Sequence, residues 1–142
     1  MTHYEPSRSK YVADHVERYL ATDGAEGAIF NGVPCIVLST MGRKTGALRR
    51  CAVIRIKDGD RYLVVGSMGG APKHPVWYLN LLADPNVTIQ DRDQVYELRA
   101  RTTTGAERAE LWTVATTVWP AYDDYQAKTD REIPVVICEP RS

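Results

Sequence analysis

The segment Thr40-Met41-Gly42-Arg43-Lys44-Thr45-Gly46 lies between two apolar, β-branched runs, and its glycines predict a turn that joins two strands. Between Met41 and Arg61 the chain carries seven Lys or Arg and two Asp, although its net charge is zero. Cations gathered on one hairpin, beside glycines that let backbone N–H groups face a guest, are typical of an anion site such as one for phosphate. On charge alone, a solvated basic turn explains the pattern equally well.

Periodicity outward from this turn predicts the neighbouring elements. Strands are expected at 33–40 and 48–56, and Asp58-Gly59 predicts a hairpin into a third strand of the same meander at 61–67. The remaining predictions are an amphipathic helix at 9–21, a helix at 74–83, a hairpin of 86–90 with 94–103, a helix from a capping box (Thr104, Glu107) to 118, a turn or short helix at 120–125, and a strand at 133–138.

This order predicts an α+β, mainly β fold. About six strands, largely antiparallel, with short flanking helices commonly curl into a small barrel. The 142 residues fit one domain, 1–142, in which an N-terminal amphipathic helix (1–24) precedes a barrel (30–142).

Composition excludes several classes of protein. No apolar run is long enough to span a bilayer, and the N-terminus lacks the pattern of a secretion signal. The pI near 6.8 argues against nucleic-acid binding. The histidines lack metal-ligand spacing, so no metal site is expected. Cys35, Cys51 and Cys138 are interpreted as buried thiols of a cytoplasmic protein, with peripheral membrane contact by the first helix left open.

Loop aromatics follow a flexible glycine segment. Gly66-Ser67-Met68-Gly69-Gly70 precedes Trp77-Tyr78, and Trp119, Tyr122 and Tyr125 share one side of a helical turn. Core packing would explain these rings, and so would a cleft for a flat, conjugated guest. Together with the basic turn they suggest a redox cofactor whose phosphate lies at the hairpin and whose ring lies over the glycine backbone.

Further motifs recur in order from about residue 30 to the C-terminus, and together they are specific. The chain resembles the deazaflavin-dependent nitroreductase family, whose split β-barrel is similar to that of flavin-mononucleotide-binding oxidoreductases. The matching segments are 38–46 with Arg49, 58–62, Gly66-Ser67 with Gly69-Gly70, 74–81, 84–87, Ala100-Arg101, Glu107-Arg108 with Leu111-Trp112, 120–126 and 129–135.

The resemblance implies binding of coenzyme F-420, an 8-hydroxy-5-deazaflavin with a phosphodiester and an oligoglutamate tail. Arg43, Lys44, Thr45 and Arg49 would hold the phosphate. The other implied cofactor positions are Gly66, Ser67 and Met68 along the polar edge of the ring, and Ala52, Val76 and Trp77 around the ring. Trp119, Tyr122 and Tyr125 would face the substrate. Tyr122 or Tyr125 would steer the acceptor or give it a proton, with Ser67 as the weaker proton donor.

The predicted activity is hydride transfer from reduced deazaflavin to a flat, electron-poor acceptor, namely a quinone, an activated alkene or a nitro compound. One alternative is a non-catalytic protein that carries or protects the deazaflavin. Another is a related barrel that uses flavin mononucleotide (FMN). The sequence leaves open whether the protein is a monomer or a homodimer.

Overall fold

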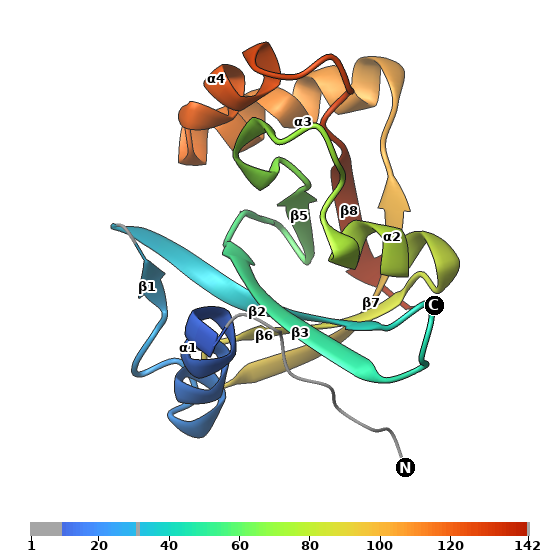
Figure 1. Ribbon diagram of the computed structural model, residues 1–142. Helices are drawn as coiled ribbons and strands as arrows, with labels where there is room; N and C mark the ends of the chain where they lie inside the picture. The colour runs from blue at the N-terminus through green and yellow to red at the C-terminus, as the bar shows by residue number, and fades with distance from the viewer. Residues whose placement is uncertain (1–9, 31, 142) are drawn as a thin grey trace.

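The computed structural model describes residues 10–30 and 32–141, in which eight strands form one antiparallel sheet (Figure 1). The strand order is β1-β2-β6-β7-β8-β5-β4, and β3 pairs with β2 off this path, so the sheet does not close on itself. The strands are β1 (Ile29–Phe30), β2 (Val33–Met41), β3 (Leu48–Ile54), β4 (Lys57–Asp58), β5 (Arg61–Val65), β6 (Asn86–Asp91), β7 (Gln94–Thr102) and β8 (Val135–Pro140).

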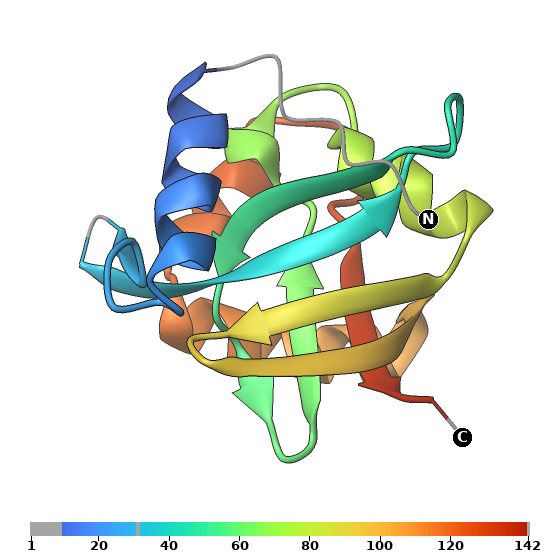
Figure 2. The same cartoon turned by 90° about the horizontal axis from the view of Figure 1, so that it is seen from below.

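Four α-helices and one 3-10 turn flank the sheet. They are α1 (Lys10–Ala21), η1 (Met68–Gly70), α2 (Val76–Ala83), α3 (Gly105–Val118) and α4 (Ala121–Ala127). Helices α3 and α4 lie together over β5 and β8, whereas α1 lies at the opposite end, against β2 and β3 (Figures 1 and 2). None of the helices in the described ranges has the length and apolar character needed to cross a membrane.

The basic turn forms as predicted, because its own backbone closes it. The amide of Gly42 donates to the carbonyl of Ala47 (2.7 Å), and the amide of Gly46 donates to the carbonyl of Gly42 (2.8 Å). Gly46 has φ +71°, a conformation that favours glycine. The register of β2 on β3 places Thr40 opposite Arg49 and Ser39 opposite Arg50. The turn thus brings two arginines beside the end of a buried strand.

The predicted three-stranded meander is wrong. The hairpin at Asp58-Gly59 exists, but its strands are β4 and β5, and β5 pairs onward with β8 rather than with β3. The chain leaves β3 at Arg55, whose Nε donates to Asp91 Oδ2 (2.8 Å), and Ile56 is buried in a second cluster. The two-residue strands β1 and β4 raise the number of strands above the predicted six.

The predicted capping box is also wrong. Thr104 is the N-cap residue of α3, but its side chain makes no capping hydrogen bond. Glu107 instead accepts two hydrogen bonds from the guanidinium of Arg101, at 2.7 and 3.0 Å. A bidentate, charge-assisted pair is stronger than a bond to a neutral amide, so the arginine on β7 takes the carboxylate.

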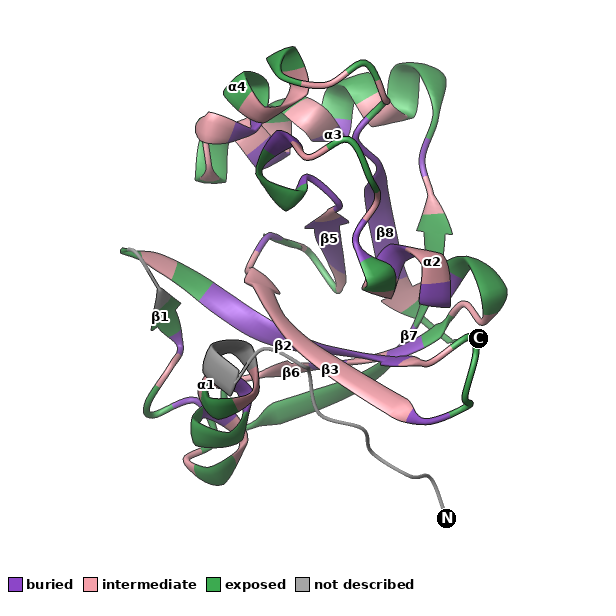
Figure 3. Cartoon of the chain, viewed as in Figure 1, coloured by how far each residue is buried: buried purple, intermediate pink, exposed green. Residues whose placement is uncertain are grey.

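Three clusters of buried side chains hold these layers together. One lies between α2 and strands β2, β5, β6, β7 and β8, one between α3–α4 and strands β5 and β8, and a small one under α1. Figure 3 shows β5 and most of β2 as buried, whereas β3 is of intermediate burial along its whole length. The half-buried β3 borders the space between the clusters, and the candidate site lies there.

Candidate active site

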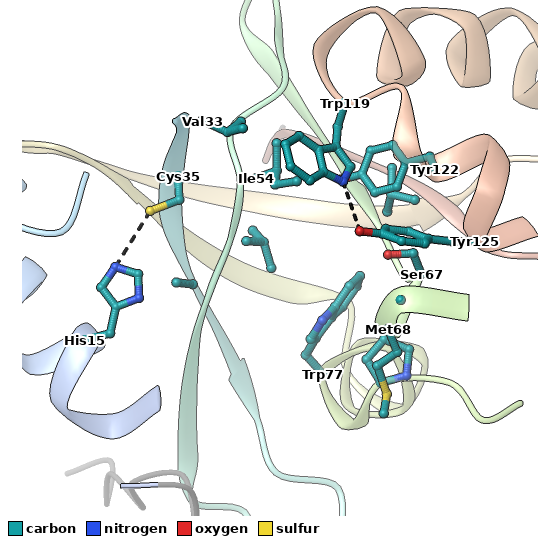
Figure 4. Close-up of a pocket in the computed structure, with 15 residues that line it drawn as sticks. His15, Val33, Cys35, Ile54, Ser67, Met68, Trp77, Trp119, Tyr122 and Tyr125 are labelled. Carbon is teal, nitrogen blue, oxygen red and sulfur yellow. Dashed lines mark hydrogen bonds between the residues drawn. The ribbon is translucent and has the colours of Figure 1, made fainter. Parts of the chain in front are cut away.

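A cavity of about 440 Å³ lies between β3, the glycine segment, α2 and the corner joining α3 to α4 (Figure 4). Its wall is mostly apolar and aromatic, which is typical of a pocket for a small organic molecule. Seven predicted site residues meet there, namely Ala52, Ser67, Met68, Trp77, Trp119, Tyr122 and Tyr125. These residues come from segments that are far apart in the sequence, and the fold brings them together around one cavity.

A smaller cavity of about 190 Å³ adjoins the first, and Trp77 lines both. Its other lining residues are Thr40, Arg49, Arg50, Cys51, Val76 and Asn80. The indole of Trp77 is therefore a shared wall between an apolar cavity and one that contains two guanidinium groups. The predicted positions Arg49 and Val76 belong to this second, cationic cavity.

The remaining predicted phosphate residues, Arg43, Lys44 and Thr45, are exposed on the basic turn. Asn80, which is 2% exposed, fixes the turn to α2: its Oδ1 accepts from the amide of Arg43 (3.1 Å), and its Nδ2 donates to Thr40 Oγ1 (3.2 Å). The turn therefore has a fixed backbone and solvated cationic side chains. The phosphate role of its three side chains stays a prediction.

The glycine segment presents a backbone concavity to the large cavity. Ser67 is in the right-handed region (φ −75°, ψ −40°), whereas Met68 (φ 46°) and Gly69 (φ 63°) are left-handed. Successive residues in these two regions turn their N–H groups toward a common point, a nest that binds anionic atoms. No described residue accepts a hydrogen bond from the amides of Ser67 and Met68, so both are available to a guest.

Two glycines seat this segment by close approach. A Cβ at Gly66 would lie 2.7 Å from Pro134 Cγ, and one at Gly70 (φ +86°) would lie 2.7 Å from the carbonyl oxygen of Tyr125. Contacts this short leave no room for a side chain. The segment is thus held directly beneath α4, which carries two of the predicted substrate residues.

The aromatic group at the α3–α4 corner has one ordered polar contact. Trp119 Nε1 donates to Tyr125 Oη (3.3 Å), which leaves the Tyr125 hydroxyl hydrogen free to donate (Figure 4). Tyr122 is buried, and its ring packs edge-on against that of Tyr125, at 6.2 Å between centroids. Burial, followed by the neighbouring Tyr125, raises the pKa of Tyr122 well above the usual value for tyrosine. Tyr122 is therefore a neutral wall residue at physiological pH.

The opposite wall of the cavity was not predicted. His15 from α1 and Cys35 from β2 line it, with His15 Nε2 3.9 Å from Cys35 Sγ (Figure 4). Both also contact the carbonyl oxygen of Gly27: His15 Nε2 lies 2.8 Å away and Cys35 Sγ donates at 2.9 Å. Burial raises the pKa of the Cys35 thiol, so it stays protonated. Sequence spacing carries no signal for this pair, because only the packing of α1 on β2 brings the two residues together.

A family model described as F420H(2)-dependent quinone reductase matches residues 11–140. The chain belongs to this family. An F420H(2)-dependent quinone reductase of Mycobacterium tuberculosis is 35% identical over 127 residues, which cover 87% of this chain and 85% of that protein. The resemblance inferred from the sequence motifs is thereby confirmed.

Solved structures give the same result. An F420-H2 dependent reductase, FDR-A, is 43% identical with a TM-score of 0.71, over 75% of this chain and 94% of that one. A structure described as a domain-swapped dimer is 39% identical with a TM-score of 0.74, over 94% of this chain and all of that one. A protein assigned as a pyridoxamine 5′-phosphate oxidase of Listeria innocua shares the fold alone, at 11% identity and a TM-score of 0.52 over 89% of this chain and 93% of that one. The predicted mainly β, split-barrel class is confirmed, with the sheet left open.

Proposed function

We propose that this chain is an F-420-dependent reductase that transfers a hydride from the reduced deazaflavin to a quinone. The observation that carries the proposal is membership of the quinone reductase family over residues 11–140. Relatives named for the same activity cover most of the chain at 35% identity. Activated alkenes and nitro compounds, which the sequence analysis included, are secondary acceptors under this proposal.

The residues present fit such a cofactor. The cavity of about 440 Å³ lies within the range of roughly 300–1,000 Å³ usual for small-molecule sites. The nest at Ser67-Met68 lies on its wall, where it can face the polar edge of a ring. Arg49 in the adjoining cavity, with Arg43 and Lys44 on the exposed turn, can hold an acidic handle. The proposed cofactor residues are therefore Arg43, Lys44, Thr45, Arg49, Ala52, Gly66, Ser67, Met68, Val76 and Trp77.

The bound deazaflavin would supply the hydride. The protein would orient the acceptor, exclude water from the site and supply a proton. The amides of Ser67 and Met68 would stabilise negative charge at the polar edge of the ring. The apolar wall, with Trp119 and Tyr122, positions a flat acceptor and excludes water. Tyr125 Oη, which accepts from Trp119 Nε1 and keeps its own hydrogen, would donate a hydrogen bond or a proton to the reduced acceptor oxygen.

The decisive experiment titrates purified protein with the oxidised and the reduced deazaflavin and then adds menadione. The expected result is saturable binding followed by loss of the reduced cofactor signal and formation of the hydroquinone. Binding without turnover of any quinone would favour the non-catalytic carrier. A purified protein that retains FMN and does not bind deazaflavin would favour the flavin alternative.

Assembly and location extend the proposal. A relative that is 39% identical is described as a domain-swapped dimer, and on that basis we propose a homodimer for this chain rather than a monomer. Light scattering coupled to size-exclusion chromatography tests it, with a mass near 32 kDa expected for two chains of 15.9 kDa. The three free thiols, Cys35, Cys51 and Cys138, are consistent with the cytoplasmic location predicted from the sequence.

A further inference from the structure

A single guanidinium holds the glycine segment from behind. Arg131 lies in the connection between α4 and β8, and its Nη1, Nη2 and Nε donate to the carbonyl oxygens of Gly66 (3.0 Å), Ser67 (2.8 Å) and Ala71 (2.8 Å). Nη1 also lies 3.1 Å from His74 Nδ1. The planar fork of arginine is suited to several acceptors in a fixed arrangement. These contacts join residues more than 55 positions apart in the chain.

The hydrogen bonds to the carbonyls of Gly66 and Ser67 fix the direction of the N–H groups in the same two peptides. In a trans peptide the C=O and the following N–H point in opposite directions. When the carbonyls of Gly66 and Ser67 face Arg131, the amides of Ser67 and Met68 therefore point away from it. Both residues line the large cavity, so the same rotation of the backbone that satisfies the guanidinium also presents the nest to a ligand.

The segment needs such support, because its backbone is strained. Met68 has φ 46°, a left-handed conformation that residues other than glycine adopt only at a cost in free energy. The charge of Arg131 is balanced by carbonyl dipoles, since no carboxylate of the described residues forms an ion pair with it. Burial lowers the pKa of the guanidinium, but arginine remains charged at neutral pH. A cation thus lies behind the peptides that face the cavity.

We propose that Arg131 is a positioning residue that aims the amides of Ser67 and Met68 at the cofactor ring and whose charge favours the reduced, more negative form of that cofactor. The inference rests on the proposed function, since it takes a deazaflavin as the guest. Arg131 itself touches carbonyl oxygens of the chain and lies behind the nest, so its effect is on binding preference and potential.

The test measures dissociation constants of oxidised and reduced deazaflavin, and the midpoint potential of the bound cofactor, in wild type and Arg131→Met. The expected result is weaker binding of both forms, with at least a tenfold greater loss for the reduced form. A tenfold change in this ratio lowers the potential by about 30 mV for a two-electron couple. An unchanged ratio in Arg131→Met, with wild type binding normally, would overturn the inference.

Arg108→Met is the matched control. Arg108 also holds the connection between α4 and β8, through a hydrogen bond from Nη2 to the carbonyl of Ile133 (2.6 Å) and an ion pair with the carboxylate of Glu132 (3.0 Å). Among the described residues, no hydrogen bond or ion pair joins Arg108 to Gly66–Ala71. This variant is expected to lower stability and leave the ratio of dissociation constants unchanged. A change of the ratio equal to that in Arg131→Met would assign the effect to the connection and contradict the role of Arg131.

Arg131→Lys covers the case in which Arg131→Met does not fold. It keeps the charge and loses the fork, so both forms should bind more weakly with a potential near that of wild type. In the cofactor-free protein, hydrogen exchange of the Gly70 and Ala71 amides, which bond to Ser67 and Met68 carbonyls, should accelerate. Wild-type exchange and affinity in Arg131→Lys would refute the positioning role. A wild-type protein that binds no deazaflavin would instead refute the proposed function.

Discussion

The basic turn at 42–47 joins the strands that carry Thr40 and Arg49 of the small cavity, and the glycine segment at 66–70 lines the large one. Both depend on glycine, yet they are built differently. The turn is closed by its own backbone, and its cationic side chains are exposed. The segment is strained, packed beneath α4 and held by a guanidinium from a distant connection. The cationic side chains of the turn must therefore still become ordered when a ligand binds, whereas the backbone amides of the segment are already in position.

Glycine substitutions should separate the two regions most strongly. Gly70→Ala adds left-handed strain and a collision with the Tyr125 carbonyl, and it is expected to cost about 3 kcal/mol of unfolding free energy. Gly46→Ala in the turn is the matched control, because it has a similar φ of +71° and no atom within 4 Å. Strain alone should cost it about 1 kcal/mol. Urea unfolding measures both, and equal losses would contradict the contrast.

Removal of a cationic side chain should weaken cofactor binding more when that side chain lines a cavity than when it is exposed. Arg49 lines the small cavity, so Arg49→Ala is expected to weaken deazaflavin binding by about 2 kcal/mol, roughly thirtyfold. Lys44→Ala on the exposed turn should weaken it no more than about fivefold. Titrations at two salt concentrations measure both effects, with Lys57→Ala on the remote β4–β5 hairpin as the control. A larger loss for Lys44→Ala than for Arg49→Ala would place the anion on the turn instead.

The tyrosines over the glycine segment should affect turnover more than cofactor affinity. Tyr125→Phe removes the hydroxyl that accepts from Trp119 Nε1, and turnover of menadione is expected to fall about tenfold, as for one lost hydrogen bond. Tyr122→Phe should have a smaller effect, because Tyr122 acts as a buried wall. Steady-state rates and cofactor titrations of both variants provide the measurement, and a reversed order would exchange their roles.

Lowering the pH should reduce the stability of the protein slightly, through protonation of His74 beside the glycine segment. Burial, and then the charge of Arg131, lower the pKa of His74 below 6.5. His74 therefore binds a proton more readily in the unfolded chain than in the folded one. The stability that neutral His74 allows is fully present above pH 6.5, and it is lost as the pH falls from 6.5 through the lower pKa of the folded state. Thermal unfolding between pH 7.5 and 5 should show a shallower decline in His74→Gln than in wild type. Identical slopes would show that His74 does not contribute.

Local features were predictable from the sequence, and contacts between distant segments were not. The basic turn, the hairpin of β6 and β7 and the aromatic group at the α3–α4 corner follow from turn residues and periodicity. The pairing of β5 with β8 does not, since it joins Tyr62 to Cys138 across 76 positions. Glu107 was assigned to a cap because sequence spacing does not reveal that Arg101 competes for it.

The candidate site shows the same division. Chemistry-bearing residues such as Ser67, Trp77 and Tyr125 could be grouped from their types and from the family resemblance. Asn80 and Arg131 could not, because an amide or a guanidinium that serves the backbone has no sequence pattern of its own. The far wall formed by His15 and Cys35 depends on how α1 packs. The single-domain organisation predicted from length stays a prediction.

The indole of Trp77, which borders both cavities, has a consequence for which molecules can be retained. A compound with a flat ring system and an acidic arm can occupy both cavities at once. Because the two groups are covalently linked over a short distance, binding of the second group takes place at a high effective concentration. Cutting off the arm would then forfeit more affinity than the arm's own contacts supply. Flat molecules that lack such an arm would be held only briefly, as suits an acceptor that must leave after each turnover.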